Sequence, residues 1–229
     1  MATKILDISL CLSARRKVLP WRKLEQAMGL YDRYILPHLL NLAMRNGQLA
    51  PYRQRVISLA SGRVLEIGVG SGLNLPFYNS RATGIIGLDP HPKLIDMASH
   101  QASSVPTKIL GGSAESIPVD TASIDTVVTT WTLCTIPDVM AALREMRRVL
   151  KPGGQLLFAE HGLAPEEGVR RWQHRLTPLW KGLAGGCHLD RPIAELVRTA
   201  GFEISHMETG YMRGPRTMTF MYEGSAHPL

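Results

Sequence analysis

The 229-residue sequence has little of what several classes of protein need. It has only three cysteines, Cys11, Cys134 and Cys187, whose odd number and wide spacing argue against a disulfide framework and favour a reducing cytoplasm. It has no CxxC or His-x-x-x-His pair, so spacing predicts no metal site. No apolar run reaches the roughly 18 residues that span a membrane, and the first residues lack the pattern of a secretion signal.

Aromatic residues make up only 6% of the chain, while the formal net charge is +7. Part of this charge lies near the N-terminus, in Arg15, Arg16, Lys17, Arg22 and Lys23. The strands show no interleaved aromatic pattern of an RNA-binding module, so we expect no nucleic-acid partner. A solvated basic face is the first interpretation of this segment, and a peripheral contact with an anionic membrane is the second.

Strand-like apolar runs alternate with helical periodicity, which predicts an α/β fold with a Rossmann-like, doubly wound parallel sheet. The expected parallel strands are 63–67, 83–88, 107–111, 124–129 and 154–160. The expected helices between them are 72–79, 91–102 and 137–150. After these come helices at 166–183 and 191–200 and a hairpin of strands 202–209 and 216–223. The hairpin adds one antiparallel strand, which brings the sheet to about seven strands. Ahead of the sheet we expect a helical extension, with helices at 32–45 and 52–60 and a segment over 1–30 broken near Pro20.

The first expected strand leads into three alternate glycines, Gly68, Gly70 and Gly72. Because glycine has no Cβ, a ligand can lie against the backbone N–H groups of such a turn. The second strand ends at Asp89, where a carboxylate suits the two hydroxyls of a ribose. These features predict a nucleoside-type cofactor, and the alternative is a glycine-rich turn without a ligand.

The spacing also distinguishes between cofactors. In a dinucleotide site the third glycine comes one position later, where this chain has Leu73. Glu66, inside the strand, would repel a phosphate but suits a cationic ligand. S-adenosylmethionine has a ribose, an adenine and a sulfonium, and no phosphate. The Glu-x-Gly-x-Gly-x-Gly pattern resembles the first motif of class I S-adenosylmethionine-dependent methyltransferases, so a nicotinamide oxidoreductase is the weaker alternative.

The resemblance covers about residues 60–160 and is to the type 11 methyltransferases. The run Gly112-Ser113-Ala114-Glu115-Ser116-Ile117-Pro118 resembles a Gly-Asp-Ala-Glu-x-Leu-Pro signature, with Ser113 in place of the aspartate that binds the adenine amino group. The resemblance implies S-adenosyl-L-methionine as cofactor and S-adenosyl-L-homocysteine as product. The implied cofactor residues are Glu66, Gly68, Gly70, Gly72, Asn74, Asp89, Pro90, Ser113, Ala114, Glu115, Thr130, Trp131 and, from the N-terminal extension, Tyr31.

Features around and beyond the core resemble a small methyltransferase-like family whose animal members methylate thiols. They are Leu133-Cys134, Glu160-His161, Trp172-Gln173, Pro178-x-Trp180-Lys181 and Gly186-Cys187-x-Leu189-x-Arg191. Those relatives carry an N-terminal hydrophobic anchor, whereas this chain has a basic segment. The implied acceptor is a small molecule with a thiol, and the candidate pocket residues are Tyr34, Leu133, Trp172, Trp180, Cys187 and Arg191.

His161 is the candidate for the base that removes the thiol proton, and Glu160 would orient it or bind substrate. The alternative for His161 is a hydrogen bond to the following loop. Tryptophans eight residues apart more often belong to a core than to a pocket, and Cys187 is read as a buried thiol, with Cys134 packed behind the cofactor.

The length fits one domain, a methyltransferase domain over 1–229. Within it we expect 1–60 to be the extension or lid, 61–160 the cofactor core, and 161–229 the acceptor-pocket helices and hairpin. We therefore expect a cytoplasmic methyltransferase, membrane-peripheral in the second interpretation of the basic segment. Phospholipid amines and quinones are alternative acceptors, and a cofactor-binding sensor or partner subunit is the alternative without catalysis. The sequence does not indicate an oligomeric state.

Overall fold

The computed structural model describes residues 29–229 and contains a seven-stranded sheet in the order β3-β2-β1-β4-β5-β7-β6. The first five strands in this order are parallel to one another, and β7 lies antiparallel between β5 and β6. The strands are β1 Gly62–Ile67, β2 Ala82–Asp89, β3 Thr107–Gly111, β4 Ile124–Thr130, β5 Leu150–His161, β6 Phe202–Tyr211 and β7 Phe220–Pro228. This arrangement confirms the predicted Rossmann-like fold with its C-terminal hairpin.

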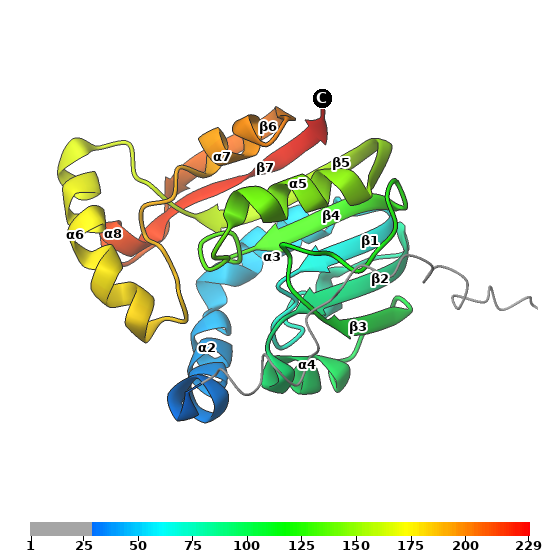
Figure 1. Cartoon of the computed structure of the whole chain (residues 1–229), viewed down its shortest axis with the longest axis horizontal. Coiled ribbons are helices and arrows are strands. Elements are labelled where there is room, and N and C mark those ends of the chain that lie inside the picture. The colour runs from blue at the N-terminus through cyan, green and yellow to red at the C-terminus, as the bar shows by residue number, and fades with distance from the viewer. Residues whose placement is uncertain (1–28) are drawn as a thin grey trace, which may run out of the picture.

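Helices cover both faces of the sheet (Figure 1). The α-helices are α2 Leu36–Met44, α3 Ala50–Ile57, α4 Pro92–Ser99, α5 Val139–Val149, α6 Glu167–Leu183, α7 Ile193–Thr199 and α8 Arg216–Thr219. Shorter helical turns are η2 Tyr31–Ile35, η3 Gly47–Leu49 and η4 Leu75–Phe77. In the part of the chain that the structure describes, no helix has the length and apolar character needed to cross a bilayer.

The two faces have separate cores because successive strand residues point to opposite sides. In β1, Leu65 packs into the core beneath α5 and α7, while Val64 packs into the core beneath α3 and α4. In β4, Val127 and Val128 divide in the same way. All four side chains are fully buried, which explains why the central strands are continuous apolar runs.

The predicted elements between residues 32 and 229 are present, with three notable differences. The predicted helix 72–79 is only the single turn η4, because Gly72 has a φ of +79° and Pro76 disfavours a helical residue before it. The strand expected at 216–223 begins at Phe220, after the short helix α8, and β5 starts four residues earlier than predicted. The helical segment predicted for residues 1–30 falls almost entirely outside the described residues.

The carboxyl ends of the parallel strands meet at one end of the sheet, and α2 and α6 lie at that same end (Figure 1). Pro37 stands in the first turn of α2, a position that suits its fixed φ. The turn η2 runs directly into α2, so together they match the helix predicted over 32–45, and α2 passes over the loops that follow the strands.

Packing between β5, β6 and β7 can be tested at Gly224. A Cβ at this position would collide with the His206 carbonyl oxygen and lie 2.9 Å from the Phe158 ring. We expect Gly224→Ala to lower the free energy of unfolding by about 1–3 kcal/mol, the usual cost of overpacking. Gly210→Ala in β6 is the matched control, because its Cβ would meet no atom within 4 Å. Denaturant midpoints compare the two, and equal stability of both variants would contradict this account of the packing.

Candidate active site

A cavity of about 410 Å³ lies at the carboxyl ends of the parallel strands. Its walls come from the loops after β1, β2, β3 and β4, and α2 contributes Leu36, Leu40 and Met44, which are spaced four residues apart on one helical face. The expected cofactor residues that line the cavity are Gly68, Gly70, Asn74, Asp89, Pro90, Ser113, Ala114, Thr130 and Trp131.

The glycine turn after β1 requires residues without a Cβ. Gly68, Gly70 and Gly72 have φ values of +69°, +54° and +79°, in the left-handed region that glycine adopts readily. A Cβ on Gly68 would also collide with the Thr132 side chain. Gly68 and Gly70 line the cavity, while Gly72 packs against Ala98 of α4. Main-chain atoms of the turn therefore form part of the cavity wall without a side chain in front of them.

Asp89 is the last residue of β2 and is only 6% exposed. One carboxylate oxygen accepts the Gly70 N–H at 3.0 Å, and the other accepts the His91 N–H at 2.8 Å. Burial raises the pKa of Asp89, and these two N–H groups oppose the shift. The carboxylate is thus fixed at the cavity wall with oxygen lone pairs to spare for a ligand's hydroxyl groups.

Glu66 lies beneath the cavity wall and forms the centre of a buried network. Its carboxylate accepts hydrogen bonds from Asn74 Nδ2 at 2.9 Å and from the Tyr78 hydroxyl at 2.8 Å. Asn74 also donates to Thr130 Oγ1 and accepts from Arg53 Nε, both at 2.9 Å. Burial raises the pKa of Glu66 to about 7 against the opposing effect of these partners. Glu66, a predicted cofactor residue, therefore does not line this cavity and is connected to its wall by Asn74.

Arg53 is a cavity residue that the sequence did not single out. Its guanidinium lies 5.2 Å from the centre of the Trp131 ring and donates to the Met44 carbonyl at 3.0 Å. Burial lowers the pKa of Arg53, and the nearby Glu66 carboxylate opposes the shift. Arg53 stands between Tyr52 and Gln54 in a polar helix, so no sequence signal marks it as the buried arginine.

Two other expected cofactor residues lie away from the cavity wall. Glu115 holds its own loop together, since its carboxylate accepts the Asp138 N–H at 2.7 Å and a hydrogen bond from the Ser113 hydroxyl. The Tyr31 hydroxyl donates to the Leu183 carbonyl at 2.9 Å and so connects the start of the described chain to the end of α6. Both residues thus position neighbouring segments.

Glu160 and Arg191 were expected to take part in acceptor chemistry, but their hydrogen bonds hold the loop after β4. The fully buried Glu160 carboxylate accepts the Thr129 hydroxyl at 2.8 Å and the Thr132 N–H at 2.9 Å. Burial raises its pKa to about 7, opposed by backbone N–H groups of the loop. Arg191 donates to the carbonyls of Leu133 and Ile136. Leu133 itself is fully buried in the core, so it does not line a pocket.

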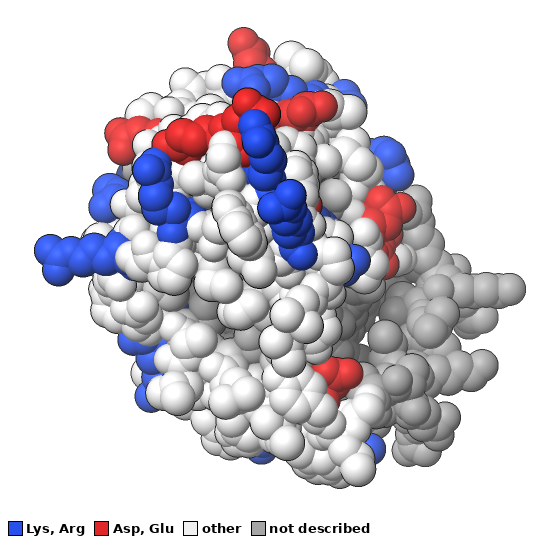
Figure 2. Space-filling model, turned by 90° about the vertical axis from the view of Figure 1, so that its left-hand side faces the viewer, with Lys and Arg blue, Asp and Glu red and all other residues white. Residues whose placement is uncertain are grey.

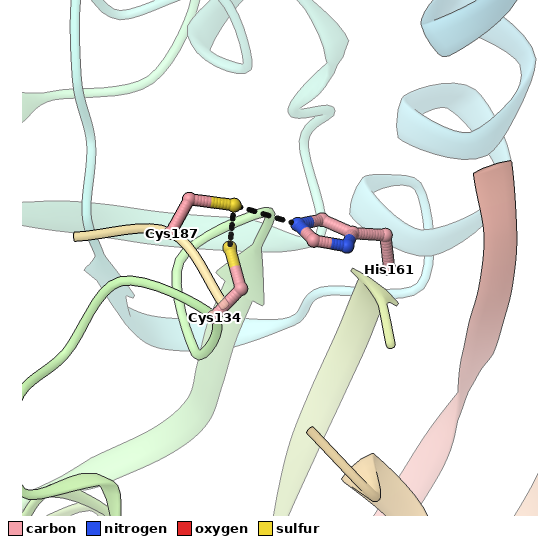
Figure 3. Close-up of side chains that lie close together, drawn as sticks. All are labelled: Cys134, His161 and Cys187. Atoms are coloured by element: carbon pink, nitrogen blue, oxygen red, sulfur yellow. Dashed lines mark hydrogen bonds between the residues drawn. The ribbon is translucent and has the colours of Figure 1, made fainter. Parts of the chain in front are cut away.

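Three side chains that are far apart in the sequence converge beside this loop (Figure 3). His161 Nε2 lies 3.1 Å from Cys187 Sγ, and Cys187 Sγ lies 3.7 Å from Cys134 Sγ. All three residues are buried. The contact with Cys134 lowers the pKa of Cys187, and hydrogen bonds from His161 and Trp180 act in the same direction against burial. Burial alone would lower the pKa of His161, but its contact with Cys187 outweighs this and raises it.

Cys187 is the buried thiol that the sequence predicted, and it has a histidine and a cysteine beside it that no CxxC or His-x-x-x-His spacing indicated. The sequence could not show this cluster, because 26 and 53 residues separate Cys187 from its partners. The hydrogen bond from the His188 N–H to the Cys134 carbonyl, at 2.9 Å, joins the two loops that carry the cysteines. Thr135 and Gly185 of these loops line the cavity, so the cluster lies directly behind its wall.

Trp172 and Tyr34 contribute to neither the core nor the cavity. They are 56% and 58% exposed, and the guanidinium of Arg175 lies 5.6 Å from the centre of the Trp172 ring. The buried residue on that part of α6 is Gln173, whose amide donates to the carbonyls of Gly162 and Leu189. Figure 2 looks onto this end of the molecule, where uncharged atoms cover much of the centre of the view. Exposed apolar side chains of α2 and α6 include Leu39, Leu42, Trp172, Leu179 and Leu183.

Comparison with known proteins adds evidence of a different kind. A family profile described as a methyltransferase domain matches residues 65–158. The human thiol S-methyltransferase TMT1B is 30% identical over 197 residues, which are 82% of this chain and 80% of that protein. The rat TMT1B is 32% identical over 151 residues, 63% of this chain, and the chain spans only 62% of its length. The solved structure of a SAM-dependent methyltransferase from Thermotoga maritima has a TM-score of 0.61 at 20% identity, covering 86% of this chain and all of that one.

The buried Glu66 carboxylate predicts a specific pH dependence of stability. Its pKa is raised from 4.5 to about 7 in the folded protein, so between these values the native state holds a proton that the unfolded state has released. The free energy of unfolding attributable to Glu66 therefore falls as pH rises from about 4.5 to about 7. Glu66→Gln should remove this part of the pH dependence.

Urea unfolding of wild type and Glu66→Gln across this pH range measures the effect. The stability of wild type relative to the variant should fall with rising pH and become constant above about pH 8. Glu195→Gln on the exposed surface of α7 is the matched control and should follow wild type at every pH. A wild-type-to-variant difference that stays constant with pH would show that folding does not shift the pKa of Glu66.

Proposed function

Because the chain belongs to the class I S-adenosylmethionine-dependent methyltransferases, we propose that it transfers a methyl group to the sulfur of a small thiol. The methyl donor is S-adenosylmethionine, as in the rest of that family. The observation that carries the thiol acceptor is the 30% identity to human thiol S-methyltransferase TMT1B over 80% of that protein's length. The cavity and the cluster behind its wall supply supporting chemistry.

The residues of the cavity fit this cofactor. Its volume of about 410 Å³ falls in the range of small-molecule sites, roughly 300–1,000 Å³. Asp89 would hold the ribose hydroxyls, because its carboxylate is fixed at the wall by two backbone N–H groups. Ser113 and Ala114 lie on the loop after β3 and would border the adenine. Gly68 and Gly70 let the backbone approach the ligand closely.

The charges around the cavity suit the amino-acid end of the same cofactor. Arg53 lines the cavity and would pair with the carboxylate of that end. Glu66 places negative charge beneath Asn74 on the same side when it is ionised, which suits an ammonium group and disfavours a phosphate. A cavity with Arg53 and Asp89 in its wall and Glu66 beneath Asn74 fits a zwitterion better than a pyrophosphate.

In the acceptor half, the chain must align a thiol, remove its proton and exclude water. When bound, the cofactor supplies an electrophilic methyl group carried on a sulfonium. His161 would take this proton, and its Nε2 lies 3.1 Å from the sulfur of Cys187. Glu160 and Arg191 act as positioning residues, because they fix the backbone of the loop after β4, which carries Cys134 and also lines the cavity.

Cofactor binding tests the role of Asp89. We expect Asp89→Ala to weaken the affinity for S-adenosylmethionine by about 1.5–3 kcal/mol, or about 10- to 150-fold, through loss of hydrogen bonds to a charged group. Isothermal titration calorimetry measures this affinity. Asp96→Ala on the exposed surface of α4 is the matched control and should bind like wild type. Unchanged affinity in Asp89→Ala would place the ribose elsewhere.

The acceptor is tested with isotopically labelled S-adenosylmethionine and three separate acceptors: a simple alkyl thiol, vesicles containing phosphatidylethanolamine, and a quinol. We expect a labelled thioether from the thiol, identified by mass spectrometry. Labelled product from vesicles or quinol alone would overturn the thiol assignment. Tight cofactor binding without turnover of any acceptor would instead favour a sensor or partner subunit.

The same assay tests His161 in protein that has first been treated with a metal chelator. His161→Gln should lower kcat by roughly 100-fold or more, the usual contribution of a general base, while cofactor affinity stays unchanged. The matched control is His174→Gln, because His174 is an exposed histidine whose ring pairs with Asp190. Wild-type kcat in His161→Gln would remove His161 from the mechanism.

A further inference from the structure

Cys134, His161 and Cys187 each present one metal-ligating atom to the same point (Figure 3). The three atoms lie within 4.8 Å of one another and come from three separate segments: the loop after β4, the end of β5 and the loop after α6. A packed apolar interior would not need two thiols and an imidazole directed at one another. Thiolate and imidazole are the ligands that zinc prefers in proteins.

The distance between the sulfurs matches that of a tetrahedral zinc site. With Zn–S bonds of about 2.3 Å and a Zn–N bond of about 2.0 Å, two ligand sulfurs lie about 3.8 Å apart and a nitrogen and a sulfur about 3.5 Å apart. The two sulfurs are 3.7 Å apart in the structure, His161 Nε2 is 3.1 Å from Cys187 Sγ, and the three ligand atoms lie within 4.8 Å of one another. The sulfurs therefore need almost no movement, and the imidazole must shift until its nitrogen lies about 3.5 Å from both sulfurs. A disulfide would require the sulfurs to approach to about 2.05 Å.

The charge balance also favours a divalent cation. An isolated charge in such a buried place is costly. Two thiolates and a neutral imidazole neutralise Zn²⁺, so its binding releases two protons from the cluster and leaves the net charge of the cluster at zero. The neighbouring Arg191 and Glu160 carry opposite charges, and each already has partners in the loop. The cluster can therefore take up zinc without a further counter-ion.

We propose that Cys134, His161 and Cys187 bind one Zn²⁺ ion, and that the acceptor thiol occupies its fourth position. Within residues 29–229, no fourth His, Cys, Asp or Glu completes the group. Three protein ligands and one open position are typical of a catalytic zinc site, whereas structural sites are closed by four. Thr135 and Gly185, which line the cavity, lie one and two residues from the cysteine ligands, so the loops that carry both cysteines also form part of the cavity wall.

The role of the fourth position rests on the proposed function, whereas the metal site itself does not. When the acceptor binds, its S–H bond breaks as the S–Zn bond forms, and the proton leaves to solvent water. The thiolate electron pair then forms the new C–S bond while the bond between the methyl carbon and the sulfonium sulfur breaks, and S-adenosylhomocysteine leaves with the electron pair of the broken bond. The thioether product is a neutral and weaker ligand that departs. With zinc bound, His161 is a ligand, and coordination replaces its action as a base.

Metal binding is measured on the full chain, first stripped with a chelator and then titrated with Zn²⁺ against a chromophoric chelator. Elemental analysis should give about one zinc per chain. Substitution with Co²⁺ should produce the near-ultraviolet charge-transfer absorption of cobalt–thiolate bonds. Cys134→Ser and Cys187→Ser should each weaken zinc binding roughly tenfold or more and reduce the cobalt band. Cys11→Ser is the matched control for losing a cysteine and should bind like wild type.

Circular dichroism of each variant confirms that it is folded before its affinity is compared. A folded wild-type chain that takes up no zinc, or a folded double variant Cys134→Ser/Cys187→Ser that binds zinc like wild type, would overturn the metal site. Addition of the alkyl thiol should shift the cobalt absorption without any turnover, because it enters the fourth position. An unshifted spectrum would overturn that part of the proposal.

The outcomes also separate this inference from the proposed function. Stoichiometric zinc binding without methylation of thiols would support the site and contradict the acceptor. Methylation of thiols at the same rate by chelator-stripped and zinc-loaded protein would support the acceptor and contradict a role for zinc in the reaction.

Discussion

The cavity depends on the burial of one carboxylate, that of Glu66. A buried acid is tolerated only when hydrogen-bond donors surround it, and Glu66 has them from Asn74 and Tyr78. Asn74 in turn connects to Thr130 at the end of β4 and to Arg53 in α3. The side chain of one strand therefore fixes the glycine turn, the next loop and a helix together. Such a network is cooperative, because removing one member leaves the others buried without partners.

A second buried acid, Glu160, fixes the loop after β4 by accepting hydrogen bonds from it. Glu160 holds the loop after β4 through the Thr132 N–H, and Arg191 holds the carbonyls of Leu133 and Ile136. These contacts allow Trp131 to adopt a φ of +48°, which is unfavourable for a residue with a Cβ. The tryptophan ring then lies over Arg53, which belongs to the Glu66 network. Glu66 and Glu160 thus each fix part of the cavity wall. The Arg53–Trp131 cation–π contact and the hydrogen bond from Asn74 to Thr130 connect the two parts.

The features that the sequence predicted are those encoded locally. The apolar runs, the alternate glycines and the acid at the end of β2 each depend on a few adjacent residues, and the structure has them where they were expected. Helix phase was less certain: Trp172 was considered for the core or a pocket, but Gln173 is the residue that turns inward. The meeting of His161 with Cys187 was not predictable, because it depends on how α6 returns to the sheet. The same holds for Arg53, which is buried by contacts with distant residues.

The site residues that the sequence predicted lie mostly at strand ends and turns, and those that it missed lie in other segments. The cofactor half is built from strand ends and turns, which a sheet of this order places together in any protein with this fold. The segments that we assign to the acceptor in the proposed function lie outside that pattern: α2, the loop that carries Cys187 and the last residue of β5. A fold alone does not determine an acceptor. In this chain the segments outside the common pattern bring two sulfurs and an imidazole to the back of the cavity wall. Thiolates and an imidazole are ligands for a thiophilic metal ion such as zinc. The proposed metal site therefore rests on the segments that lie outside the common pattern of the fold.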